Sequence, residues 1–167
     1  MSHWAGRANL EYYRVVKDWL TALGPRTSLI DVGCHDTPVA TWGDFRLRFS
    51  IDGQDRPELP GVTKIVGMWP EHRPQPESLF SVITCLQVIE HVVEPAAFCA
   101  SLCAAASDAV ILSVPLRWPR GTERDHKHDP ISESMIAQWM GRQPNLTHIT
   151  VGRCKRGVFL YDMVKIL

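Results

Sequence analysis

The segment that most constrains how this chain folds is Ser28–Cys34. It is a mostly apolar run that contains Asp31 and has Gly33 as its second-last residue. A carboxylate and a glycine at the end of such a run indicate a buried parallel strand whose carboxyl end meets a ligand. A second apolar run, Leu47–Ile51, stops at Asp52, 21 positions after Asp31. In dinucleotide-binding units, an acid about 20 residues further on accepts hydrogen bonds from a ribose. The pair predicts an open α/β sheet with a cofactor site at its carboxyl edge.

Four segments together carry a family resemblance: Leu29–Cys34, Ser50–Gly53, Leu79–Val92 and Ile111–Pro115. In order and spacing they resemble the class I S-adenosylmethionine-dependent methyltransferases. The resemblance implies a Rossmann-like open sheet that is mostly parallel, has a C-terminal antiparallel strand and carries helices on both faces. One departure is that the family continues Gly-Cys-Gly-x-Gly, whereas this chain has Gly33-Cys-His-Asp-Thr-Pro38 and keeps only the first glycine.

Length, charge and cysteine content narrow the function classes. The chain of 167 residues predicts one domain over 1–167 with its own core. Lys+Arg and Asp+Glu balance at 18 each, so no electrostatic field favours nucleic acid. No apolar run reaches the roughly 20 residues of a membrane span, and no signal peptide is evident. We expect a cytoplasmic protein with free cysteine thiols, a small-molecule acceptor and no nucleic-acid or membrane partner; a homo-oligomer stays open.

The remaining patterns alternate between helix and strand. Apolar residues at helical spacing predict an amphipathic helix over about residues 9–23, stopped by Gly24-Pro25. Strands are predicted at 62–66, 80–86 and 108–114, and an alanine-rich helix from Pro95 through Ala106. Residues 54–61 hold two prolines and a glycine, which predicts a loop where the family has a helix.

The C-terminal third opens with a long irregular segment, residues 116–129, which we interpret as a substrate loop. Its Trp118 suits a sugar face, and Arg120 is a further candidate substrate contact. A helix capped by Asp129-Pro130 and ended by Gly141 should follow. Strands at 145–151 and 158–166 should close the sheet as an antiparallel hairpin.

The strand ends supply the residues expected around S-adenosylmethionine. Asp31 would accept a hydrogen bond from the methionine ammonium, and Asp52 would accept from both ribose hydroxyls. The alternatives are that each aspartate only caps a turn, and that Trp69, expected to stack on adenine, packs in the core. The cofactor set implied by the resemblance is Asp31, Gly33, Cys34, Thr37, Asp52, Gly53, Met68, Trp69, Leu86 and Gln87.

Histidines mark the expected acceptor side. The resemblance places His91 beside the transferring methyl group, and an imidazole can take a hydroxyl proton near neutral pH. His126 and His128 lie two apart, so on an extended backbone they face the same side, with Asp129 next to them. Any one of the three histidines could be the base, and the others in the loop, together with Asp129, would be substrate contacts. The alternatives are a helix-start histidine bonded to the backbone and a solvated loop.

A metal site is the weaker alternative. Some methyltransferases hold a divalent cation with a Glu-x-x-Glu-His pattern and a later residue. This chain keeps Glu90 and His91 but has Gln87 at the first glutamate, which loses one charged ligand. His126 or His128 could supply a nitrogen ligand suited to a transition metal. On balance we expect no metal.

The sequence therefore favours an enzyme that O-methylates a small, largely neutral hydroxylated molecule such as a sugar or glycosylated metabolite. The segment 113–130 resembles methyltransferases of bacterial saccharide and secondary-metabolite clusters. The alternative is a non-catalytic binding or partner subunit with the same fold, which the lost glycines and the missing helix after Asp52 motivate. An RNA 2′-O-methyltransferase is disfavoured by the neutral charge.

Overall fold

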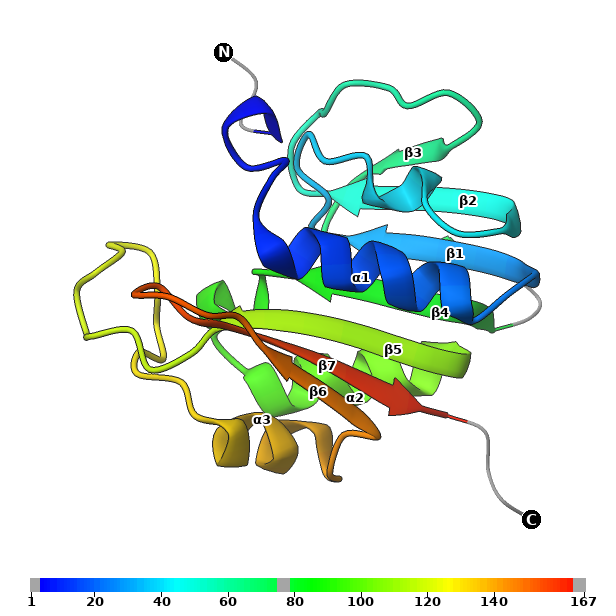
Figure 1. Cartoon of the computed structure of the whole chain (residues 1–167). Coiled ribbons are helices and arrows are strands. Elements are labelled where there is room, and N and C mark those ends of the chain that lie inside the picture. Colours follow the sequence, from blue (N-terminus) through cyan, green and yellow to red (C-terminus); the bar gives the residue numbers. More distant parts are fainter. Residues whose placement is uncertain (1–3, 75–78, 164–167) are drawn as a thin grey trace.

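Seven strands form one sheet in the computed structural model, which describes residues 4–74 and 79–163 (Figure 1). The strand order is β3-β2-β1-β4-β5-β7-β6. The strands are β1 (Arg26–Val32), β2 (Phe45–Asp52), β3 (Thr63–Val66), β4 (Phe80–Leu86), β5 (Ala106–Pro115), β6 (Leu146–Ile149) and β7 (Arg156–Asp162). The first five strands pair in parallel, whereas β7 is antiparallel to β5 and β6. The predicted mostly parallel, Rossmann-like sheet is confirmed.

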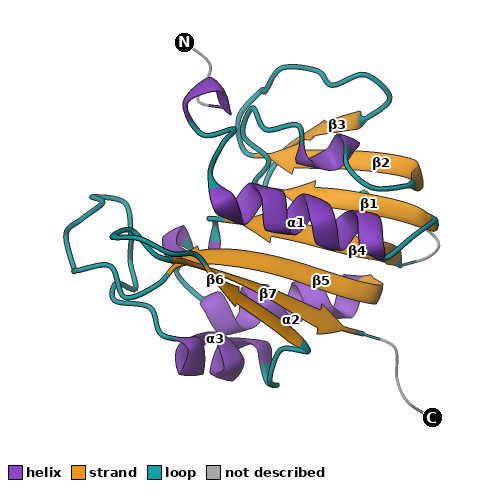
Figure 2. Ribbon diagram, viewed as in Figure 1, coloured by secondary structure: helices purple, strands orange, loops and turns teal. Residues whose placement is uncertain are grey.

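Helices cover both faces of the sheet, as predicted (Figure 2). They are α1 (Glu11–Ala22), α2 (Pro95–Ala105) and α3 (Glu133–Met140). Consecutive strand residues point to opposite faces. Leu29 of β1 accordingly packs in the core that contains Leu20 of α1, and Ile30 packs in the core that contains Leu102 of α2. None of the helices in the described ranges is long and apolar enough to cross a membrane.

The strand order reverses at β1. From β1 the chain continues to β2 and β3 on one side and then returns to β4 on the other. Asp31 is in register with Ser50 of β2 and with Thr84 of β4. In open α/β sheets such a reversal leaves a crevice outside the carboxyl ends of the strands. The fold therefore places Asp31 at the base of the predicted ligand site.

The start of α3 differs from the sequence prediction. The side chain of Ser132 accepts a hydrogen bond from the Met135 backbone N–H at 3.3 Å, so this serine is the N-cap and not Asp129-Pro130. The helix does end at Gly141, whose φ of +69° gives the left-handed cap that glycine favours.

The closing hairpin is shorter than predicted. β6 and β7 begin and end inside the expected ranges 145–151 and 158–166, except that β7 starts two residues early, at Arg156. Residues 164–166 lie outside the described residues. The loop predicted at 54–61 and the helix start at Pro95 are confirmed.

Candidate functional site

A cleft of about 280 Å³ opens at the carboxyl ends of β1, β2 and β4. Its walls contain eight of the residues singled out from the sequence: Asp31, Gly33, Cys34, Thr37, Asp52, Leu86, Gln87 and His91. Arg7, Tyr13, His35 and Val88 complete the lining. The cleft thus brings together residues from the N-terminal segment and three strand ends, at the reversal of the strand order.

The loop that follows β1 requires glycine at position 33 for two reasons. Gly33 has a φ of +73°, and a Cβ built on it would lie 2.4 Å from Val88 Cγ2. Both the backbone conformation and the close approach of Val88 therefore require glycine. Beyond it, a turn replaces the family's other glycines, since the backbone N–H and the hydroxyl of Thr37 both donate to the Cys34 carbonyl, at 3.1 and 2.9 Å. Burial raises the pKa of the Cys34 thiol to about 12.

Asp31 is a buried carboxyl at the end of β1. It is 2% exposed and accepts a hydrogen bond of 2.6 Å from the Thr84 hydroxyl. Burial raises its pKa to about 7, and the neighbouring charge of Asp52 acts in the same direction. A ligand ammonium in the cleft would favour the ionised form of this carboxyl.

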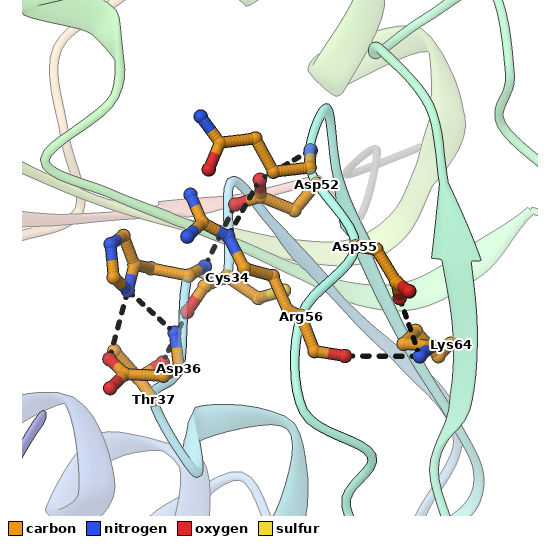
Figure 3. A network of polar contacts seen from close by, with 9 residues as sticks. Cys34, Asp36, Thr37, Asp52, Asp55, Arg56 and Lys64 are labelled. Carbon is orange, nitrogen blue, oxygen red and sulfur yellow. Dashed lines mark hydrogen bonds and ion pairs between the residues drawn. The ribbon is translucent and has the colours of Figure 1, made fainter. Parts of the chain in front are cut away.

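Asp52 is held in one orientation by three donors (Figure 3). The backbone N–H of His35 donates to Oδ2 at 2.9 Å, and the backbone N–H of Gln54 donates to Oδ1 at 2.9 Å. The Arg56 guanidinium forms an ion pair with Oδ1 at 3.0 Å. Asp52 therefore both caps a turn and lines the cleft. A ribose bound there would share its carboxylate with Arg56.

The loop after β2 is anchored to β3. The Lys64 ammonium donates to Asp55 Oδ1 at 2.7 Å and to the Arg56 carbonyl at 3.0 Å (Figure 3). The bond to the Arg56 carbonyl holds the residue that pairs with Asp52, whereas the Asp55 side chain is exposed. An ordered loop thus stands where the resembling family has a helix.

Three residues of the predicted cofactor set are absent from the cleft walls. Trp69 is 6% exposed in the core, and its indole N–H donates to the Ser101 hydroxyl of α2 at 2.9 Å, so the core-packing alternative describes it. Met68 is 62% exposed, and its sulfur lies where a side chain on Gly53 would project. Adenine stacking by Trp69 required the indole to face the cleft, and its burial against α2 prevents this.

Where the sequence analysis expected the acceptor side, His126 pairs with Asp129. His126 Nδ1 lies 2.8 Å from Asp129 Oδ2, with the two side chains 6% and 2% exposed. The His91 ring lies edge-on to the His126 ring, with centroids 5.0 Å apart, and His91 Nδ1 lies 3.2 Å from the Asp125 carbonyl oxygen. Partial burial lowers the pKa of His91. The turn η3 (Ile89–His91) and the loop 116–129 thus meet beside the cleft.

Glu90 lies in the same place and is 1% exposed. Burial raises the pKa of its carboxyl to about 8. Glu90, His91 and His126 each offer one metal-ligating atom, and these atoms lie within 4.8 Å of one another. They are the residues in the described part of the chain that could hold a cation.

The predicted pairing of His126 with His128 is wrong. The backbone bends at this point, and His128 Nε2 donates to the Val92 carbonyl at 2.6 Å while its ring contacts Trp139. Alternation of side chains applies to extended backbone only, so the two histidines diverge. His128 contacts Val92 and Trp139 and is not among the residues that line the cleft.

Trp118 and Arg120 are also placed differently from the expectation. Trp118 is 8% exposed, stacks on His126 at 5.8 Å and has the Arg156 guanidinium 5.0 Å from its ring centroid. A ring packed in this way supports the histidine and has little surface left for a sugar. Arg120 is exposed, and its Nε lies 3.5 Å from the Asp129 carbonyl oxygen.

Arg156 is a site residue that the sequence analysis missed. Its Nε donates to Gln87 Oε1 at 3.1 Å, and its guanidinium lies 5.4 Å from the Tyr12 ring centroid. Gln87 in turn donates to the Ser113 hydroxyl at 3.2 Å. The register of β7 against β5 brings Arg156 next to Gln87. The basic residues at 153–156 do not by themselves predict this contact from the sequence.

No family model and no curated protein matches the sequence. Solved structures match its fold. The N-methyltransferase NodS from Bradyrhizobium japonicum WM9 is 7% identical, with a TM-score of 0.72 over 93% of this chain and 96% of that chain. Magnesium protoporphyrin IX methyltransferase (ChlM) from Synechocystis PCC 6803 with bound SAH is 19% identical, with a TM-score of 0.67 over 91% and 81% of the two chains.

A third match is the cyclopropane synthase MmaA2 from Mycobacterium tuberculosis, which is 13% identical, with a TM-score of 0.63 over 85% of this chain and 63% of that chain. The chain therefore has the Rossmann-like fold of the class I S-adenosylmethionine-dependent methyltransferases. By their names the three matched proteins act on different acceptors, so the fold alone does not select the atom that is methylated.

Proposed function

We propose that this protein transfers a methyl group from S-adenosylmethionine to a hydroxyl of a small acceptor, such as a sugar or a glycosylated metabolite. The observation that carries the proposal is the convergence of Asp31, Asp52 and His91 on one cleft where the strand order reverses. Two carboxyls suit a donor with an ammonium and a ribose diol, and an imidazole suits activation of a hydroxyl. The fold shared with NodS and ChlM, both methyltransferases by name, supports it.

The donor would lie along the carboxyl ends of β1 and β2. Asp31 would receive the methionine ammonium, and Gly33, which has no side chain, would let the donor approach the loop backbone closely. Asp52 would receive the ribose hydroxyls. Leu86 and Val88 supply apolar wall at the end of β4. The methyl group would then point toward His91.

Methyl transfer forms an O–C bond to the acceptor as the C–S bond of the sulfonium breaks, and the hydroxyl proton has to leave. His91 and His126 are the catalytic residues of this proposal, because the His91 ring lines the cleft and the His126 ring lies edge-on to it, with centroids 5.0 Å apart. The loop 116–129 holds them in place, since the Lys127 backbone N–H donates to the Glu90 carbonyl at 2.8 Å. A positioned acid–base group contributes roughly 10²–10⁴-fold to rate.

A second candidate is a non-catalytic binding or partner subunit, and one observation favours it. The Arg56 guanidinium pairs with Asp52 Oδ1, which also accepts from the Gln54 backbone N–H, so a ribose would compete for this oxygen. In that case the cleft would bind the donor weakly, and the protein would act through another chain.

Single-turnover methyl transfer to a panel of hydroxylated sugars and glycosides would test the proposal. The labelled donor is S-adenosylmethionine, and the variants are His126→Ala and, as a matched control from the same loop, His128→Gln. We expect at least a 100-fold loss for His126→Ala and near-normal transfer for His128→Gln. Equal rates in all three proteins would remove His126 from the mechanism, and donor binding without any transfer would favour the non-catalytic alternative.

A further inference from the structure

Three side chains with metal-ligating atoms converge beside the cleft, and one of them, His91, lines its wall. Glu90 and His91 are consecutive in η3, and His126 comes from the loop 116–129. Their ligating atoms lie within 4.8 Å of one another. Segments that lie 35 residues apart in the sequence thus meet at one point, and the contacts between η3 and the loop fix this meeting.

The Glu90 carboxyl carries a specific sign of a missing partner. Its residue is 1% exposed, and Oε2 has no hydrogen-bond partner among the described residues. An oxygen buried without a partner is unfavourable, because it has lost water and gained nothing in exchange. A cation bound to Oε2 would supply the missing interaction.

Both histidines have the kind of hydrogen-bond partner that metal-ligating histidines usually have. His126 Nδ1 faces Asp129 Oδ2 at 2.8 Å, and His91 Nδ1 faces the Asp125 carbonyl oxygen at 3.2 Å. Since both partners are acceptors, each Nδ1 carries the proton and each Nε2 keeps its lone pair. Ligating histidines commonly have such a carboxylate or carbonyl partner on the second nitrogen, which fixes the tautomer.

Gln87 does not belong to the ligand set. Its amide nitrogen donates to Ser113, and its oxygen accepts from Arg156. The set is therefore one carboxylate and two imidazoles. Nitrogen-rich sets of this kind suit iron, nickel, copper or zinc better than magnesium or calcium, which prefer oxygen ligands.

We propose that Glu90, His91 and His126 hold a divalent transition-metal cation at the acceptor side of the cleft, with Asp129 as the positioning residue for His126. Its catalytic role rests on the function proposed above. Three protein ligands leave coordination positions open for the acceptor hydroxyl, as in catalytic metal sites. A cation-bound hydroxyl is more acidic, so its proton leaves to water and its oxygen attacks the methyl carbon. With the cation bound, His91 and His126 would activate the hydroxyl as ligands of the cation, which replaces the direct base role given to them above.

Cation binding can be measured without turnover. The protein is stripped with a chelator and titrated with Co²⁺ alone, with the visible absorption of the bound ion and calorimetry as readouts. We expect one Co²⁺ per chain for the wild type, and at least tenfold weaker binding for Glu90→Gln and His126→Ala. Asp129→Asn should weaken binding by 10- to 100-fold, as changes of a ligand's hydrogen-bond partner do. His128→Gln, a histidine of the same loop outside the cluster, should bind Co²⁺ as the wild type does.

Titration of the same proteins with S-adenosylhomocysteine separates the two proposals and reports on folding. Its binding should be unchanged in Glu90→Gln, His126→Ala and Asp129→Asn. If the wild type binds S-adenosylhomocysteine but binds Co²⁺ no better than His126→Ala does, the cation site is refuted while the methyltransferase proposal stands. If Co²⁺ binds as expected and S-adenosylhomocysteine does not bind, the cation site is supported and its role in methyl transfer is refuted.

Discussion

Changing Asp31 to asparagine should separate ligand binding from stability. Burial raises the pKa of Asp31 from 3.8 to about 7. The folded chain therefore keeps a proton that the unfolded chain releases between about pH 4 and pH 7, and over this window the contribution of Asp31 to the free energy of unfolding falls as the pH rises. A pKa increase of this size lowers the free energy of unfolding by about 4 kcal/mol, and the full effect is reached above pH 7.

An asparagine side chain at this position would still accept the Thr84 hydroxyl but would never ionise. We therefore expect Asp31→Asn to raise the free energy of unfolding at pH 8 by up to about 4 kcal/mol and to leave it nearly unchanged at pH 4. The same change should weaken S-adenosylmethionine binding at least tenfold, because an amide does not pair with the ammonium. Urea denaturation at pH 4, 6 and 8 measures the first effect, and calorimetry measures the second.

The control for this prediction is Asp55→Asn. Asp55 is exposed and pairs with Lys64, so its replacement should change neither the pH dependence nor binding by much. The reasoning is refuted if Asp31→Asn is less stable than the wild type at pH 8 and keeps the wild-type pH dependence.

Two further changes test local structure. Gly33 and Gly61 have φ angles of +73° and +72°, but of the two only a side chain at Gly33 would meet another atom, Val88 Cγ2 at 2.4 Å. Thermal unfolding should therefore show a loss of stability of about 1 kcal/mol for Gly61→Ala and a larger loss for Gly33→Ala. Gly33→Ala should also weaken donor binding. Equal costs would mean that the contact with Val88 is unimportant. Ser132→Ala should lower the free energy of unfolding by about 1 kcal/mol through loss of the α3 cap, and no loss in a denaturant titration would contradict the assigned cap.

The features that could be predicted from the sequence are those set by short segments. The run into Asp31 and the run into Asp52 predicted two adjacent strands, and the structure pairs them as β1 and β2 with both carboxyls on one cleft. Leu86 at the end of β4, and Gln87 and His91 just past it, were found for the same reason. A parallel strand delivers whatever follows it to the same edge of the sheet, so position in the sequence decides position in space.

The features that could not be predicted depend on how loops pack. Trp69 faces α2 rather than the cleft, and His128 turns away from His126 at a bend. The partnership of Glu90 with His126 requires the loop 116–129 to fold back on η3, and the place of Arg156 requires the register of β7. None of these is visible in local spacing, because each follows from contacts between distant segments.

The measurement that tests the central claim most directly is calorimetric titration of the purified protein with S-adenosylmethionine and S-adenosylhomocysteine. Asp52→Ala is the test variant, and Asp55→Ala, a neighbour in the same loop, is the control. We predict binding of both ligands in the micromolar range, at least a tenfold loss for Asp52→Ala, which is about 1.4 kcal/mol, and no change for Asp55→Ala. Absence of binding by well-folded wild-type protein would contradict the account.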